Sequence, residues 1–553
     1  MSRTPSGPGF VPSSASLATM VLLTWLLLLG VTAARALPLP QIGFAQDVGV
    51  MLDAGWRYYQ GQRTHADYHS PLGPMFGILF GLPLKLGGPT YDSLKLLPPA
   101  ITALFTLWTI AVTSRSLPPA ARMMLAAGVG SAAGGIFHLG FPVEALSFAV
   151  FYNRVGFGLL CLIGLAALLP RAETLPKWTA VFRDASIGVA LAMLLFLKVN
   201  FFLAAGPFVL LALALHRRSR GEWLACALSF AAACWFFLHD IGYRIDRMAF
   251  DLAMAADARR ACLDSFFFPL RNLISNHDFA MLLALQTVGV LPLMLARQAT
   301  AWTTAASLAG LWGPAALGFA LTLMQSHGDG RGIPLVLVGM AVCLARLPLP
   351  PTDVNPPRDG RMSPTRGVTP ETQARLMSTA CLVLAAALFV LPHAYSYAQW
   401  AAVSRNPGPR QFRAPAIRNL YVGSFGNNLG PDAVVKMNDA HDLLSRHAKP
   451  GDSLQYMDMN NIYTYAEQLR SPRKSMLFWD SRSSYTVARH PPAEDFADTD
   501  LIMAPKQRLT IGPLETDWWT IYAIDIEDRY DLVEETDFFK LWRRSRDKPP
   551  GRE

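Results

Sequence analysis

The apolar residues of this chain are collected into long blocks rather than into the narrow stripes of a soluble protein, and this constrains the fold more than any other feature. Hydrophobic residues make up 52% of the 553 positions, and charged residues only 16%. A helix needs ~20 apolar residues to cross a bilayer. We therefore expect a polytopic α-helical membrane protein of about 11 spans, with candidate spans at 17–34, 96–114, 121–137, 155–169, 185–197, 201–215, 223–238, 279–296, 302–324, 333–345 and 376–394.

Two apolar segments do not fit a simple crossing. Residues 72–86 are interrupted by Pro74, Pro83 and several glycines, and at ~1.5 Å per residue they are too short to cross upright. We expect a half-helix or a strongly tilted element there. Residues 17–34 end in small residues, as a cleaved signal peptide does, but only Arg3 precedes them as a basic residue, and an uncleaved anchor is the expectation.

The orientation follows from the basic residues, which membrane proteins concentrate in cytoplasmic loops. With the N-terminus inside and eleven crossings, the inner segments hold 15 Lys and Arg against 6 Asp and Glu, whereas residues 400–553 hold 21 against 22. The net charge of +9 is then a topology signal, and no nucleic-acid partner is needed to explain it. This predicts a cytoplasmic N-terminus and a periplasmic C-terminal region.

The chain divides at about residue 398. Residues 1–398 form the membrane domain, with a first outer loop at 38–71 and a Pro-, Arg- and Thr-rich cytoplasmic linker at 347–375. Residues 399–553 are predicted to form a small extracytoplasmic (periplasmic) α/β domain. In it DSLQYM and DLIMAP are typical of strands, DAHDLLSRHA and NIYTYAEQL of helices, and YDLVEETDFFKLWRR of a closing strand pair.

Polar and aromatic residues are concentrated just after the first span, in FAQDVGVMLDAGWRYYQGQRTHADYHSPLGPMFG (44–77). The predicted topology places this segment at the outer interface, together with the later basic residues Arg154, Lys198 and Arg331. Ionisable groups at membrane depth are costly and usually mark a site or an ion pair. Arg154 and Lys198 taken singly are also explained by snorkelling to lipid headgroups. The collection of these polar residues on one face favours a site.

A long N-terminal span, an outer loop with Asp47 a few residues in, and the run DYHSPLGP (67–74) entering the next apolar segment resemble the GT-C superfamily of integral-membrane glycosyltransferases. Protein O-mannosyltransferases and the lipid A aminoarabinose transferase belong to it. The specific similarity covers residues 44–77, with weaker echoes at YNRVGFG (152–158) and LKVNFF (197–202). Val48 stands where several of these families have a glutamate, and no second acidic motif like that of the oligosaccharyltransferases is present.

The resemblance implies a multi-pass enzyme of the bacterial inner membrane that moves a sugar from a polyprenyl-phosphate donor to an envelope glycan, lipid or protein acceptor on the periplasmic face. Asp47 matches the acidic residue of the first outer loop, and it would accept the acceptor's proton in a single, inverting displacement. Charge on the leaving lipid phosphate calls for cations at headgroup level, for which the candidates are Arg154, Lys198 and Arg331.

Four residues of the first loop are expected to contact substrate: Asp53, Trp56, Asp67 and Tyr68. The two aromatic side chains are equally explained as interfacial anchors, and Asp67 as a turn residue before SPLGP. No metal ligand is assigned, and dependence on a divalent cation (Mg²⁺ or Mn²⁺) is left open.

Two other functions fit the same outer-face charges. A transporter or flippase of lipid-linked intermediates would use them to hold a headgroup, and a non-catalytic subunit of an envelope-glycan assembly complex would keep them as a scaffold. The absence of an internal repeat counts against the transporter, and the intact first-loop acid counts against the scaffold.

Overall fold

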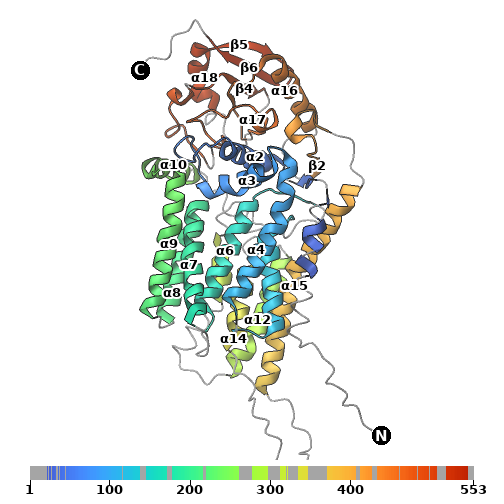
Figure 1. The fold of residues 1–553 in the computed structure, drawn as a ribbon, viewed down its shortest axis with the longest axis vertical. Coiled ribbons are helices and arrows are strands. Elements are labelled where there is room, and N and C mark those ends of the chain that lie inside the picture. The colour runs from blue at the N-terminus through green and yellow to red at the C-terminus, as the bar shows by residue number, and fades with distance from the viewer. Residues whose placement is uncertain are drawn as a thin grey trace, which may run out of the picture.

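The computed structural model describes residues 22–32, 35–137, 145–170, 177–215, 219–260, 277–296, 312–321, 334–346, 370–405, 411–425, 432–506 and 518–545, except positions 23, 27, 37, 44, 115, 319, 460, 482, 483 and 497. It is mostly helical. A bundle of apolar helices carries a smaller domain, drawn in orange and red, at one end (Figure 1). Arg331, one of the predicted phosphate ligands, lies outside the described residues.

Five of the described helices are long and apolar enough to cross a membrane: Tyr91–Val112, Phe151–Leu168, Lys177–Leu197, Arg220–Asp240 and Thr372–Arg405. The chain is therefore a multi-pass membrane protein, as its hydropathy predicts, while the count of eleven spans stays a prediction. The bundle is built from α4 (Leu97–Val112), α5 (Pro119–Gly134), α6 (Phe151–Leu168), α7 (Lys177–Leu197), α8 (Val199–Leu215), α9 (Arg220–Asp240), α12 (His277–Ala296), α14 (Leu335–Arg346) and α15 (Pro370–Arg405).

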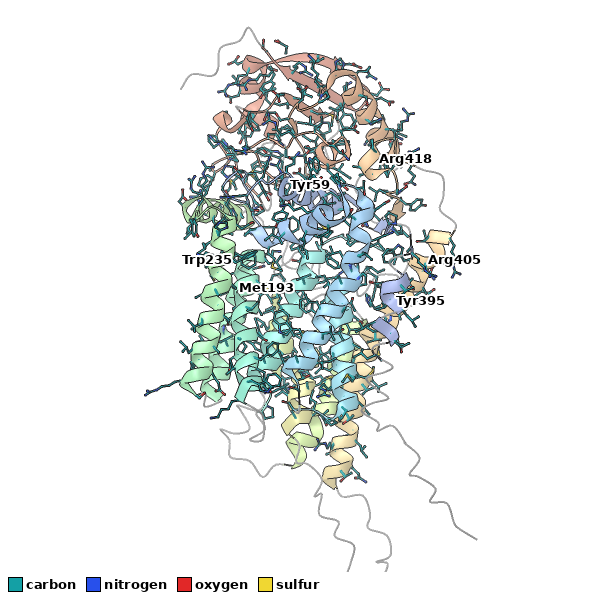
Figure 2. All side chains as sticks on the ribbon, in the orientation of Figure 1. Tyr59, Met193, Trp235, Tyr395, Arg405 and Arg418 are labelled. Carbon is teal, nitrogen blue, oxygen red and sulfur yellow. The ribbon has the colours of Figure 1, made fainter. Side chains whose placement is uncertain are left out.

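The helices differ in how much protein surrounds them. In α6, 94% of the 18-residue apolar stretch is buried, so other helices surround this helix. In α9 the figure is only 6%, and Trp235, which is exposed, lies at the outer edge of the bundle (Figure 2). Helix α9 thus presents a face suited to lipid, and α6 forms the centre.

Close packing within the bundle depends on small residues. A Cβ at Gly130 of α5 would lie 2.0 Å from Oγ1 of Thr106 in α4, and one at Gly134 would lie 2.1 Å from Oγ1 of Thr102. Only glycine permits this approach, which brings the two backbones together without a large side chain between them.

The interrupted apolar region 185–215 forms two helices. Helix α7 ends at Leu197, α8 begins at Val199, and Lys198 occupies the break. Lys198 is also the residue that interrupts the run of apolar residues in the sequence. The two helices are therefore separate elements whose ends meet at a cation.

Helices α2 (Ala45–Tyr59) and α3 (Pro74–Gly87) lie between the bundle and the C-terminal domain (Figure 1). Helix α3 has 14 residues and is about 21 Å long at ~1.5 Å per residue, which is short of the ~30 Å hydrocarbon core. This agrees with the expectation of a half-helix or tilted element at 72–86. The two helices pack closely, since Gly55 of α2 lies against the backbone of Phe80 in α3.

The C-terminal domain contains a four-stranded sheet of order β3-β4-β6-β5. Strands β3 (Leu454–Tyr456) and β4 (Leu501–Pro505) are parallel, and β6 (Phe539–Arg544) is antiparallel to β4 and to β5 (Tyr530–Glu535). Helices α16 (Ala433–His447), α17 (Ile462–Ala466) and α18 (Trp518–Arg529) accompany the sheet. Every strand and helix predicted within 439–544 has a counterpart.

Helix α15 differs from the predicted boundaries at both ends. The linker was expected to reach residue 375 and the membrane domain to end at 398, but the helix begins at Pro370 and continues to Arg405. Proline suits a helix start because no N–H is needed there. The helix outlasts the apolar run because Gln399, Ala401 and Ala402 are good helix formers, so hydropathy marks only the end of the apolar segment.

Three regions predicted to be outer segments contact one another. Strand β1 (Gln41–Gly43), before α2, pairs in parallel with β2 (Val422–Phe425), which follows α15. Helix α10 (Ile245–Arg260), after α9, shares a hydrophobic cluster with the C-terminal domain through Met254, and its Asp257 pairs with Arg489 at 2.8 Å. The first loop, the 239–260 region and the C-terminal domain therefore lie on the same side of the bundle.

Candidate functional site

Helix α2 docks onto the C-terminal domain through one of its faces. Trp56 Nε1 donates to the carbonyl oxygen of Leu469 at 2.8 Å, and Gln60 Nε2 donates to the same oxygen at 3.0 Å. Arg57 Nη1 donates to the carbonyl oxygen of Pro472 at 2.9 Å. Residues three and four apart share a helix face, so Asp53 belongs to this docking face as well. Figure 2 shows Tyr59, at the end of the helix, between the bundle and the domain.

Asp53 is occupied by structural contacts. Its Oδ2 accepts from Arg57 Nε at 3.0 Å, with no exposed side-chain surface on either residue, and Ser471 Oγ lies 3.4 Å from Oδ1. Burial raises the pKa of Asp53 above its usual value, and Arg57 offsets this only in part. Trp56 is likewise packed, stacked on Tyr59 with ring centroids 5.2 Å apart. Both residues, expected to contact substrate, lie in this interface.

The opposite face of α2 turns toward α3. Ala54 and Tyr58 lie against Gly77 and Gly81 of α3. Asp47 precedes Ala54 by seven residues, or two helical turns, and so lies on this second face rather than with Asp53. It occupies the first turn of α2, where a carboxylate is favoured by the helix dipole, and it is half-buried.

Helix α3 connects this face to the start of α6 and the end of α7. Phe76 meets Tyr152 of α6 edge-to-face with centroids 5.0 Å apart. Lys198 Nζ lies over the same Tyr152 ring, 5.5 Å from its centroid. The amide of Gly73, just before α3, donates to the carbonyl oxygen of Leu197 at 3.2 Å. The structure thus joins YNR (152–154), Lys198 and the SPLGP segment, which the sequence keeps far apart.

Arg154 lies in the first turn of α6 and is buried. It acts electrostatically on His393 of α15, whose Nε2 is 3.3 Å from Thr102 Oγ1. A cation in the first turn of a helix opposes the dipole, so the stability of α6 does not account for Arg154. The starts of α6 and α8 also adjoin, because the rings of Phe157 and Phe201 meet with centroids 5.1 Å apart.

Asp67 and Tyr68 hold the loop between α2 and α3. Asp67 Oδ2 accepts from the amide of Arg63 at 2.8 Å, which is the turn role considered for it above. The Tyr68 hydroxyl lies 2.8 Å from Thr64 Oγ1, and Arg57 stands over the Tyr68 ring, 4.9 Å from its centroid. Tyr68 is buried, and burial raises its pKa. Both residues contact protein in this structure.

A buried carboxylate on α10 joins the same loop, and sequence analysis missed it. Asp251 Oδ2 lies 2.7 Å from Nδ1 of His65, and Oδ1 lies 2.6 Å from Nδ1 of His69. The amide of Ser70 donates to Oδ2 at 3.1 Å. Burial pushes the pKa of Asp251 up, but the hydrogen bonds from the two histidines outweigh it and hold the pKa below its usual value. His65 and His69 stand in the segment already singled out, whereas no local pattern marks Asp251.

In the part of the chain that the structure describes, no group of three or more His, Cys, Asp or Glu side chains is placed to hold a metal ion. Asp251 is bound by both imidazoles through Nδ1, so this cluster is arranged as a hydrogen-bonded unit.

No protein-family model and no curated protein sequence matches the chain. Among solved structures, ArnT from Cupriavidus metallidurans in the apo state is similar over 96% of this chain and 98% of its own, with 12% identity and a TM-score of 0.48. The same protein bound to undecaprenyl phosphate covers 97% and 99%, with 12% identity and a TM-score of 0.47. The oligosaccharyltransferase of Archaeoglobus fulgidus covers 97% of this chain and 74% of its own, with 11% identity and a TM-score of 0.33. All three likenesses are distant in sequence.

Proposed function

We propose that this protein is a glycosyltransferase of the bacterial inner membrane. It transfers a sugar from a polyprenyl-phosphate donor to an envelope acceptor on the periplasmic face, with inversion and with Asp47 as general base. The observation that carries the proposal is the division of α2 into two faces. Asp53 is used for docking, whereas Asp47 lies on the face of α2 that turns toward α3.

The donor phosphate is assigned to the outer ends of α6 and α8. Arg154 and Lys198 bring two positive charges there, and the start of α6 adds the positive end of its dipole. A lipid phosphate offsets the cost of placing these charges at membrane depth. Arg331 remains a third candidate from the sequence.

The chemistry needs little more from the protein. A hydroxyl of the acceptor attacks the anomeric carbon, its proton passes to Asp47, and the bond to the lipid phosphate breaks with the electron pair leaving on the phosphate oxygen. The cations stabilise that developing charge. The half-buried Tyr152 ring, over which Lys198 Nζ lies, adjoins this proposed phosphate site.

The test is incubation of the purified, membrane-reconstituted protein with a panel of polyprenyl-phosphate sugars, followed by measurement of free polyprenyl phosphate. Release of lipid phosphate that depends on an acceptor supports the transferase. Movement of the intact donor across the vesicle membrane, with no cleavage, would identify a flippase instead. Binding with neither cleavage nor movement would identify a non-catalytic assembly subunit.

A further inference from the structure

We propose that Asp251 is a positioning residue of the transferase site, acting through His65 and His69. The inference rests on the proposed function and adds a residue from a separate outer segment. Asp251 lies on α10, 186 positions after His65 and 182 after His69, and no side-chain surface of Asp251 is exposed.

The first step is the geometry of the cluster. Both carboxylate oxygens are engaged by Nδ1 atoms, at 2.7 and 2.6 Å. A carboxylate oxygen can only accept, so each Nδ1 donates the hydrogen of its bond to Asp251 and both rings are held in a fixed orientation. The Ser70 amide adds a third donor at 3.1 Å. One carboxylate thus binds three groups of the segment that joins α2 to α3.

The second step is strain. His65 has a φ of +64°, in the left-handed region that side chains other than glycine rarely adopt. Its Nε2 is buried and has no hydrogen-bond partner among the described residues. Such a backbone conformation is kept only when several surrounding contacts hold the residue in place. The bond to Asp251 is the side-chain contact that helps to hold His65, beside the bond from its amide to the Tyr68 carbonyl oxygen, and losing it should loosen the loop.

The third step is where the loop leads. His69 also pairs with the C-terminal domain, since its amide donates to the Ser475 carbonyl and its carbonyl accepts from the Leu477 amide, each at 2.9 Å. Four residues later, the Gly73 amide reaches the Leu197 carbonyl beside Lys198. Asp251 therefore helps to hold the segment that joins α2, the helix of Asp47, to α3 at the end of the bundle where Lys198 lies.

This arrangement predicts a separation of rate from binding. The proposed phosphate ligands lie on α6 and at the α7–α8 break, whereas Asp251 holds the elements that carry the base. A displacement of ~1 Å in a reacting group can cost about 100-fold in rate. Loss of Asp251 should then lower kcat and leave the affinity for lipid phosphate nearly unchanged.

The experiment compares full-length Asp251→Asn with Asp257→Asn, a change on the same helix at a half-exposed carboxylate that pairs with Arg489. Undecaprenyl phosphate is the binding probe, and the sugar donor found in the panel above is the substrate. We expect Asp251→Asn to lose about 100-fold in kcat, with binding of undecaprenyl phosphate within about threefold of wild type. Asp251→Glu should recover part of the rate, and Asp257→Asn should match wild type.

Amide hydrogen exchange of residues 64–73 gives a readout that needs no activity. Protection should fall in Asp251→Asn and stay unchanged in Asp257→Asn. His69→Asn removes one imidazole and keeps the carboxylate, so it should show a smaller loss of kcat. It replaces Asp251→Asn as the test variant if Asp251→Asn does not fold. Wild-type exchange, wild-type kcat in the folded variants, or a parallel loss of binding and turnover would each overturn the inference. A wild-type protein that transfers no sugar would instead overturn the proposed function.

Discussion

The carboxylate of Asp53 and the guanidinium of Arg57 meet at 3.0 Å on consecutive turns of α2, and neither side chain has any exposed surface. Arg57 also bonds the Pro472 carbonyl and Ser475 Oγ, so the pair fastens the first loop to the C-terminal domain. This contact gives the two carboxylates of α2 different surroundings. Asp53 maintains the interface between domains, and Asp47 is left as the carboxylate on the other face.

Breaking this pair should destabilise the protein strongly. Removing one partner of a buried ion pair strands the other charge and costs about 3–5 kcal/mol. We expect Arg57→Ala to lower the unfolding temperature of the purified protein, followed by intrinsic fluorescence. Arg244→Ala is the matched control, because its pair with Asp246 is exposed and should contribute little. Equal unfolding temperatures for both variants would contradict the role assigned to Arg57.

Replacing the proposed base should affect turnover and leave binding intact. Asp47→Asn keeps the shape of the side chain but cannot take a proton, and loss of a general base typically costs ~100- to 10,000-fold in rate. Donor binding and membrane insertion should be preserved. Asp53→Asn should instead lower stability, with activity lost only in proportion to folded protein. Full turnover in Asp47→Asn would move the base to another residue.

Lys198 should contribute to donor affinity. Losing a charge-assisted hydrogen bond costs about 1.5–3 kcal/mol, so Lys198→Gln should weaken undecaprenyl phosphate binding by roughly 10- to 100-fold. Arg154→Ala should weaken it in the same way. Lys177→Gln is the control, because Lys177 begins α7 whereas Lys198 follows its last residue, Leu197, so the two lie at opposite ends of one helix. Equal effects at both lysines would point to nonspecific attraction.

The side of the membrane can be read with reporter fusions. Fusions after Arg218 and after Arg358 should be cytoplasmic, and fusions after Gly61, Ala256 and Gly451 should be periplasmic. The basis is the excess of basic residues in the inner segments. The structure adds a condition, because the last three positions belong to regions that contact one another. A split result among those three would contradict the fold as well as the orientation.

The contact between α10 and the loop should weaken in acid. The pKa of Asp251 is lowered from its ordinary value of 3.8 in the folded protein. Its carboxylate therefore stabilises the fold fully at pH values above 3.8. This stabilisation is lost as the pH falls through the lower pKa of the folded protein. We expect amides of residues 64–70 to lose exchange protection below about pH 4, ahead of the four-stranded sheet. In Asp251→Asn this acid-dependent step should be absent.

The membrane class, the positions of most helices and the alternating elements of the tail could all be predicted from the amino-acid sequence. These follow from local properties, since hydropathy over ~20 residues measures the cost of leaving a segment in water. Period and turn residues likewise reveal short strands such as β3 and β4. The concentration of polar residues at 44–77 is also visible locally, as is the break at Lys198.

The packing of the helices, in contrast, was needed to show which of those polar residues hold the C-terminal domain. Asp47 and Asp53 are chemically identical and six residues apart, and the sequence could not tell that Asp53 would be covered by Ser471 and Arg57. Asp251 carries no local signal, because its partners lie 186 and 182 residues away. Hydrogen bonds between such distant segments depend on how the helices pack, and a single sequence holds no direct record of that packing.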